Sequence, residues 1–177
     1  MRLFIAICFE DNVKDALKNL SVSLSEMSLH GNFTRRENFH LTLHFIGETS
    51  RVSAIKQAMD CVNFTPFKLD ADKCGKFRRD GGDIWWVGIG ENPSLKRLYA
   101  DLCKCLIKQG FKADTRDFKP HLTIGREVTV DDSFDKSKLD VRKVPEFSVN
   151  KICLMKSERI NGKLTYTCIY EKYGEDF

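Results

Sequence analysis

Two short segments of this 177-residue chain repeat one pattern of side chains that can do acid–base chemistry. Residues 40–43 are His-Leu-Thr-Leu, and residues 121–124 are His-Leu-Thr-Ile. The chain holds only four histidines, so composition alone does not account for a repeated His-x-Thr triplet that continues each time into an aliphatic residue. Residues two apart in a strand point to the same face. Each segment therefore places an imidazole beside a hydroxyl.

Two such imidazoles facing each other suit a reaction that needs an acid on one side and a base on the other. Phosphodiester cleavage is such a reaction, since His40 and His121 can exchange protons with the departing and attacking oxygens near neutral pH. The hydroxyls of Thr42 and Thr123 can bind non-bridging phosphate oxygens. Arg126 adds a guanidinium that can hold the phosphate and stabilise its developing charge.

Each of these residues also has a purely structural interpretation, which the sequence leaves open. Half-buried strands contain ordinary histidines, and threonine is a common strand residue because its side chain is β-branched. Arg126 can also be a solvated residue at the end of a strand. The duplicated context of His40 and His121 favours the chemical interpretation.

His44 follows His40 by four positions and needs its own interpretation. Residues 37–46 alternate like a half-buried strand, with one apolar and one polar face. The apolar face is expected to hold Leu41, Leu43 and Phe45, and the polar face His40, Thr42 and His44. We expect His44 at the rim of the cleft, outside the chemistry. A zinc site on His40 and His44 is disfavoured, because His-x-x-x-His spacing binds zinc from a helix and this segment is a strand.

Hydrophobic periodicity predicts the elements that must position these residues. Helices are expected after Asp11 or Asn12, after Thr49 or Ser50, and between an Asn92 cap with Pro93 and a closing Gly110. Strands are expected at the N-terminus, at both His-x-Thr segments, in a hairpin turning at Asp80, Gly81 and Gly82, and over 147–157 and 163–173. The polar stretch 128–147 is expected to be a surface connection.

Hairpins broken by helices favour an α+β protein with antiparallel sheets, and the two halves of the chain share a plan that suggests internal duplication. We expect one domain over residues 1–177, made of two packed lobes related by a pseudo-twofold axis. The helices are expected on the outside. The two His-Thr strands would then face each other across a central cleft.

Composition gives weaker information about partners and compartment. The 29 basic and 25 acidic residues leave a net charge of +4, which is a weak sign of an anionic partner. The seven cysteines show no Cys-x-x-Cys spacing, so we expect small buried hydrophobes in a reducing cytoplasm. The apolar run near the N-terminus is too short for a signal peptide or a membrane span.

The hairpin at residues 67–90 carries side chains that can contact RNA. Trp85 and Trp86 occupy adjacent strand positions, so one is expected in the core and the other exposed. The exposed tryptophan, or Phe77, could stack on a base. Arg78 and Arg79 either guide RNA toward the cleft or keep a sheet edge soluble.

Taken together, the motifs resemble the 2H phosphoesterase superfamily, and within it the RNA 2′,3′-cyclic phosphodiesterases, also called 2′-5′ RNA ligases. The resemblance rests on segments spread along nearly the whole chain: RLFIAI, ENFHLTLHFIGE, IWWVGI, FKPHLTIGR, LMKS and YTCIYEKY.

The resemblance implies a bilobal fold, no metal or other cofactor, and hydrolysis of a 2′,3′-cyclic phosphate at an RNA end to a 2′-phosphomonoester. It also implies that His121 is the proton acceptor that activates water and that His40 is the donor to the leaving 3′-oxygen. Thr42 and Thr123 correspond to the phosphate-binding threonines, and Arg126 to an arginine after the second motif. We expect a monomer.

Two other functions stay open. The same histidines run in reverse would join a 2′,3′-cyclic phosphate to a 5′-hydroxyl as a 2′-5′ linkage. A nucleotide- or RNA-binding sensor could keep the pocket without catalysis, although binding alone does not require two histidines in opposite protonation states.

Three departures from the family pattern concern substrate preference. Leu154 and Met155 precede Ser157 where relatives often have a tyrosine. His44 stands at a variable position, and Arg35 and Arg36 make the segment before the first motif unusually basic.

Overall fold

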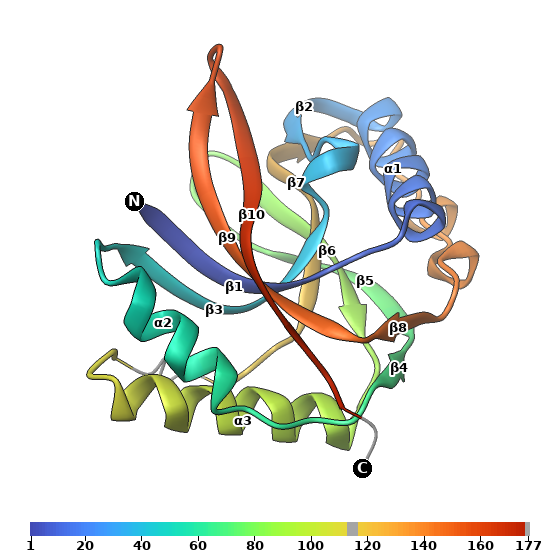
Figure 1. The fold of residues 1–177 in the computed structure, drawn as a ribbon. Coiled ribbons are helices and arrows are strands. Elements are labelled where there is room, and N and C mark those ends of the chain that lie inside the picture. The colour runs from blue at the N-terminus through green and yellow to red at the C-terminus, as the bar shows by residue number, and fades with distance from the viewer. Residues whose placement is uncertain (113–116, 176–177) are drawn as a thin grey trace.

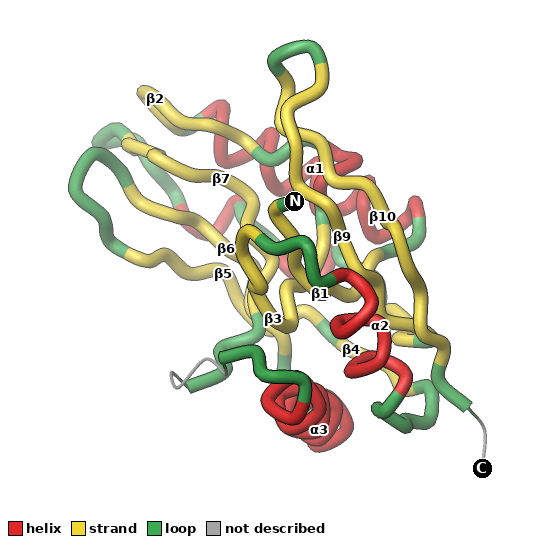
Figure 2. Tube along the Cα trace, turned by 60° about the vertical axis from the view of Figure 1, so that its left-hand side comes forward, coloured by secondary structure: helices red, strands yellow, loops and turns green. Residues whose placement is uncertain are grey.

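The computed structural model describes residues 1–112 and 117–175, which form two four-stranded antiparallel sheets (Figures 1 and 2). The first sheet has the strand order β10-β9-β1-β3, with β1 (Arg2–Cys8), β3 (His40–Glu48), β9 (Lys151–Ile160) and β10 (Lys163–Tyr173). The second has the order β2-β7-β6-β5, with β2 (Ser28–Phe33), β5 (Ala71–Phe77), β6 (Asp83–Ile89) and β7 (His121–Val130). Strands β4 (Phe67–Leu69) and β8 (Phe147–Val149) form a separate pair. The α+β prediction is confirmed.

The helices lie outside the sheets. Helix α1 (Asp11–Glu26) packs against β2 and β7, while α2 (Val52–Asp60) and α3 (Pro93–Lys108) pack against each other on the side of the first sheet (Figure 1). Short 3-10 helices span Arg36–Asn38, Lys136–Lys138 and Val141–Lys143. In the described part of the chain, no helix has the length and apolar character needed to cross a membrane.

Helix α3 begins and ends as its sequence predicts. The Asn92 side chain accepts a hydrogen bond from Leu95 N at 3.0 Å, Pro93 occupies the first turn, and Gly110 adopts a positive φ of 77° just beyond the helix. The expected caps of the other two helices were wrong. Glu10 precedes α1, and Arg51 precedes α2, with the Thr49 hydroxyl accepting from Arg51 N instead.

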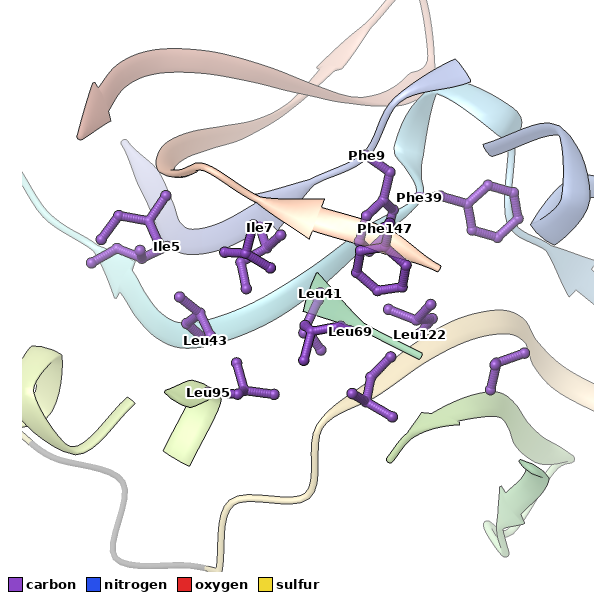
Figure 3. Close-up of a cluster of buried hydrophobic side chains, with 14 of the residues drawn as sticks. Ile5, Ile7, Phe9, Phe39, Leu41, Leu43, Leu69, Leu95, Leu122 and Phe147 are labelled. Atoms are coloured by element: carbon purple, nitrogen blue, oxygen red, sulfur yellow. The ribbon is translucent and has the colours of Figure 1, made fainter. Parts of the chain in front are cut away.

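A continuous cluster of buried hydrophobic side chains joins the two sheets (Figure 3). Leu41 of β3 and Leu122 of β7 are the middle residues of the two His-x-Thr triplets, and both are fully buried in this cluster. Burying a leucine side chain contributes about 1.5–3 kcal/mol. The two strands that carry the repeated motifs are therefore anchored in the core.

A β-bulge in β3 overturns part of the predicted alternation. Ile5 pairs with His44 and Ala6 with Thr42, so Leu43 is an extra residue without a partner on β1. Because of the extra residue, the side chains directly after it point to the face of the sheet opposite the one that strict alternation predicts. His44 is consequently buried, not at the rim, and Phe45 is 54% exposed rather than part of the apolar face.

Two further segments differ from the sequence-based expectations. Strand β2 was not predicted, because Ser28–Phe33 is short and polar, none of its residues is buried, and its partner β7 lies far away in the sequence. The stretch 128–147 is not simply a surface connection. Val128 lies in β7, while Leu139 and Val144 are buried in the core cluster.

The tryptophans of β6 are both drawn into packing. Trp85 is buried, as expected for one of the pair, but Trp86 is half-buried rather than exposed and packs against Phe77 at 5.3 Å between ring centroids. Gly75, opposite Trp86 in the ladder, makes room for the indole. A Cβ atom at Gly75 would lie 2.3 Å from the nearest Trp86 ring carbon.

We predict that Gly75→Ala lowers the free energy of unfolding by about 1–3 kcal/mol, because the added methyl overpacks the site and displaces the indole. Urea denaturation followed by tryptophan fluorescence measures the change. Gly90→Ala is the matched control, because the nearest atom to a Cβ there is 3.8 Å away and its φ is not positive. Its free energy of unfolding should change by less than about 1 kcal/mol. Equal losses in the two variants would contradict the packing role of Gly75.

Candidate active site

The two His-x-Thr segments meet in one cavity. His40 and Thr42 of β3, together with His121 and Thr123 of β7, line a cavity of about 940 Å³. Strands β3 and β7 also contact each other, so the two sheets bring the two motifs to the same place. The structure therefore assembles the residues that the sequence predicted would lie across a cleft.

Arg126 reaches this cavity because β7 carries a bulge at the same position of the motif as β3. Trp85 pairs with Gly125 and Trp86 with Thr123, so Ile124 is the extra residue. Strict alternation would place Arg126 on the face opposite His121. The bulge instead turns Arg126 into the cavity, where Phe45 occupies the corresponding position five residues after His40.

The bulged carbonyl of β7 is held by two donors. The Ser21 hydroxyl of α1 donates to Ile124 O at 2.8 Å, and Thr34 N donates to it at 3.1 Å. The Thr34 hydroxyl also donates to Thr123 O at 2.9 Å. Because the bulge interrupts the regular ladder of hydrogen bonds, these contacts provide donors for its backbone carbonyls and fix the position of Arg126.

Both imidazoles are oriented by a backbone carbonyl two residues earlier. His40 Nδ1 lies 2.7 Å from Asn38 O, and His121 Nδ1 lies 2.7 Å from Lys119 O. A carbonyl oxygen only accepts, so Nδ1 carries the proton in both neutral rings and Nε2 keeps a lone pair. The Thr42 hydroxyl lies 3.0 Å from His40 Nε2 and can donate to it. Nε2 is therefore the nitrogen of each ring that can exchange protons with a ligand.

Burial and positive charge disfavour the protonated form of both rings. Desolvation, and then the charges of Arg126 and His121, lower the pKa of His40 to about 4. Desolvation and Arg126 also lower the pKa of His121 below its ordinary value. Both rings are therefore neutral near pH 7 in the free protein. A bound anion would oppose these effects and raise both pKa values.

Aromatic side chains that the sequence did not single out desolvate His40. Its ring lies 4.8 Å from the Phe4 ring and 5.1 Å from the Tyr166 ring, the latter edge-to-face. Tyr166 comes from β10, opposite Ser157 of β9, which also lines the cavity. Leu154 and Met155 of β9 stand where relatives often have a tyrosine. In this chain Tyr166 of the neighbouring strand β10 provides an aromatic contact to His40. No local motif marks it, because cross-strand register alone brings it to His40.

His121 has a different aromatic setting. The Phe77 ring lies 5.2 Å from it, edge-to-face, and the Trp86 ring 6.4 Å from it. Aromatic side chains of the β5–β6 hairpin therefore pack beside the histidine of the second His-x-Thr motif. Phe77 and Trp86 lie beside the catalytic candidate, not at a distant surface.

The basic residues noted in the sequence fall into two groups. Arg35 and Arg126 line the cavity. In the described ranges 1–112 and 117–175, no hydrogen bond or ion pair engages the Arg126 guanidinium, so it is available to a phosphate. Arg36 instead pairs with Asp11 and Asp15 of α1, away from the cavity. Arg78 and Arg79 are exposed near the turn of the β5–β6 hairpin.

His44 has a structural role at the end of α3. Its Nε2 lies 3.2 Å from Lys112 O, and its Nδ1 lies 4.0 Å from the Cys103 sulfur. Among the residues that the structure describes, no group of three metal-ligating side chains includes His40, His44 or His121. The cavity offers acid–base groups and phosphate-binding groups.

Comparison with known proteins agrees with this arrangement. The family model of the 2′-5′ RNA ligase superfamily matches residues 10–161. An RNA 2′,3′-cyclic phosphodiesterase of Archaeoglobus fulgidus is 36% identical over 71% of this chain and 72% of its own length. One of Thermotoga maritima is 29% identical over 97% and 94%, respectively.

Solved structures show the same fold. The apo structure of E. coli LigT superposes with a TM-score of 0.82 at 23% identity, covering 99% of this chain and 98% of that one. That protein has also been solved in complex with 3′-AMP and with phosphate. The chain is similar to RNA 2′,3′-cyclic phosphodiesterases, and its paired His-x-Thr strands line one cavity. We conclude that the chain belongs to the 2′-5′ RNA ligase superfamily.

Proposed function

We propose that this protein is an RNA 2′,3′-cyclic phosphodiesterase, which hydrolyses a terminal 2′,3′-cyclic phosphate to a 2′-phosphomonoester. The observation that carries the proposal is the matched pair of imidazoles. Each has its Nδ1 proton held by a backbone carbonyl, and each leaves Nε2 to one cavity that also holds two threonines and Arg126. The names of the relatives support the same reaction.

In this reaction His121 Nε2 accepts a proton from water while the water oxygen attacks phosphorus. The bond from phosphorus to the 3′-oxygen breaks, and protonated His40 Nε2 gives its proton to that oxygen. The low pKa of His40 makes its imidazolium a ready donor. The anionic substrate supplies the negative charge that favours protonation of His40 in the complex.

The other three groups bind the phosphate. The hydroxyls of Thr42 and Thr123 donate to its non-bridging oxygens, and Arg126 adds two-pronged, charge-assisted hydrogen bonds. Preorganised donors of this kind stabilise charge that grows in the transition state. The mechanism assigns no step to a metal ion or another cofactor.

All of these residues come from one chain, and one buried cluster joins the sheets that carry them, which supports a single-domain enzyme acting as a monomer. None of the seven cysteines forms a disulfide, which suits a reducing cytoplasm. RNA 2′-5′ ligation would use the same groups, with a 5′-hydroxyl in place of water as the nucleophile that attacks phosphorus and with the same bond to the 3′-oxygen breaking. High water concentration favours hydrolysis.

The test is to incubate the purified protein in EDTA with RNA ending in a 2′,3′-cyclic phosphate and to identify the product by chromatography. A 2′-phosphate end is expected. A 3′-phosphate end, or activity that requires added zinc, would refute the proposed reaction. Accumulation of 2′-5′ linked RNA when a 5′-hydroxyl strand is present would show ligation.

We predict that His40→Ala and His121→Ala each lower kcat by roughly 10²- to 10⁴-fold, because each removes one positioned proton transfer. The profile of rate against pH should be bell-shaped in the wild type and lose one limb in each variant. The double variant should be little worse than the weaker single one, since residues that act as a unit are not additive. Full activity after loss of either histidine would rule out the two-histidine mechanism.

Arg126→Lys is expected to lower kcat/KM about tenfold to a hundredfold, since an ammonium cannot reproduce the two-pronged guanidinium contact. Steady-state kinetics with a 2′,3′-cyclic nucleotide measures the effect. Arg36→Lys is the matched control, because Arg36 pairs with α1 outside the cavity and its kinetics should stay near wild type. Similar losses in both variants would argue against phosphate binding by Arg126.

We predict that inorganic phosphate raises the pKa of both catalytic histidines. In the free protein their pKa values lie below the ordinary value, that of His40 at about 4, so both lose their protons as the pH rises toward neutrality. A bound anion favours the protonated rings and moves both titrations to higher pH. NMR of the imidazole signals, recorded against pH with and without phosphate, measures this. Unchanged titrations at saturating phosphate would show that the anion does not bind between the rings.

A further inference from the structure

A second cavity, of about 570 Å³, adjoins the catalytic cleft and contains thiols that the proposed reaction does not use. Cys8, Cys153 and Cys168 line it. His40 and Tyr166 line both cavities, so the two spaces share a wall. No local motif marks this grouping, because the cysteines come from three different strands.

Strand register gathers two of these thiols with a carboxylate. Glu171 of β10 pairs with Cys153 of β9, and Cys168 pairs with Met155. Ile169 is an extra residue between them, so this bulge turns Cys168 and Glu171 to the same face of the sheet. The two sulfurs and a carboxylate oxygen of Glu171 all lie within 4.8 Å of one another. The Cys168 sulfur is 3.9 Å from Glu171 Oε1.

These atoms form a donor set suited to zinc. Zn²⁺ binds thiolate sulfur at about 2.3 Å and carboxylate oxygen at about 2.0–2.2 Å, so its tetrahedral ligands lie roughly 3.5–3.8 Å apart. The three donor atoms, which lie within 4.8 Å of one another, must therefore move closer together by about 1 Å at most to hold the ion. Thiolate ligands select zinc over magnesium or calcium, which prefer oxygen.

Neighbouring side chains already orient the carboxylate. Lys151 donates to Glu171 Oε1 at 2.6 Å, and the Tyr173 hydroxyl donates to Glu171 Oε2 at 2.8 Å. Such outer contacts hold metal ligands in place. The charges also balance, since a divalent cation and the Lys151 ammonium offset two thiolates and one carboxylate. Cys153 is buried whereas Cys168 is exposed, which gives an ion a route from solvent.

We propose that Cys153, Cys168 and Glu171 bind one zinc ion beside the catalytic cleft, with water in the fourth position. The site is separate from the histidine chemistry, because its three ligands take no part in the proton transfers. The proposed zinc site lies in the second cavity, which His40 also lines.

The test uses the full chain, freed of metal by EDTA under reducing conditions and then titrated with Co²⁺ and with Zn²⁺. Co²⁺ is expected to give a near-ultraviolet thiolate-to-cobalt charge-transfer band at one ion per chain, and Zn²⁺ to bleach it. Cys153→Ser and Cys168→Ser should each lower zinc affinity at least about tenfold and weaken the band. Glu171→Gln should lower affinity and keep the band. Cys61→Ser, at the exposed end of α2, is the matched control and should match the wild type.

A second measurement needs no variant and so does not depend on variants folding. Zinc is expected to slow alkylation of Cys168 by iodoacetamide and to leave Cys61 labelling unchanged, as followed by mass spectrometry. A missing charge-transfer band, a band that persists in Cys153→Ser and Cys168→Ser, or equal protection of Cys61 would overturn the site. Binding is measured without RNA, so this outcome is independent of the hydrolysis assay.

Discussion

The β-bulge that follows each His-x-Thr triplet is the constraint on which the cleft depends. In both β3 and β7 one extra residue, Leu43 or Ile124, reverses the facing of the chain directly after the threonine. The reversal buries the next residue and turns the one after it, Phe45 or Arg126, toward the ligand space. One lobe thereby supplies an aromatic ring and the other a guanidinium at equivalent positions. The two halves share this backbone geometry, while their side chains have different roles.

The backbone and the surrounding side chains control different properties of His40 and His121. Carbonyls of residues 38 and 119 hold Nδ1 of the two rings and so determine which nitrogen exchanges protons. Desolvation, to which the aromatic neighbours contribute, and the charge of Arg126 keep the pKa values of both rings low. An anion between the two rings would favour their protonated forms, because opposite charge nearby stabilises the imidazolium.

Stability and chemistry lie on the same strands but on opposite faces. Leu41 and Leu122 pack in the cluster that joins the sheets (Figure 3). The flanking histidine and threonine of each triplet line the cavity. Rigid, fully buried anchors of this kind hold catalytic groups more precisely than loops can. A β-bulge also shapes the second cavity, which Cys8, Cys153 and Cys168 line, because the bulge in β10 brings Cys168 and Glu171 to one face of the first sheet.

The sequence by itself determined what depends on short-range periodicity. Residues two apart on a strand share a face, so spacing alone pairs His40 with Thr42 and His121 with Thr123. The cap of α3 followed equally from local residue types. Arg126 was predicted from its place after the second motif, although strict alternation would have turned it away from His121. Only the tertiary structure decided that His44 is buried and that Tyr166 covers His40. Both depend on cross-strand register, which is fixed by the packing of segments distant in the chain and leaves no local pattern to detect.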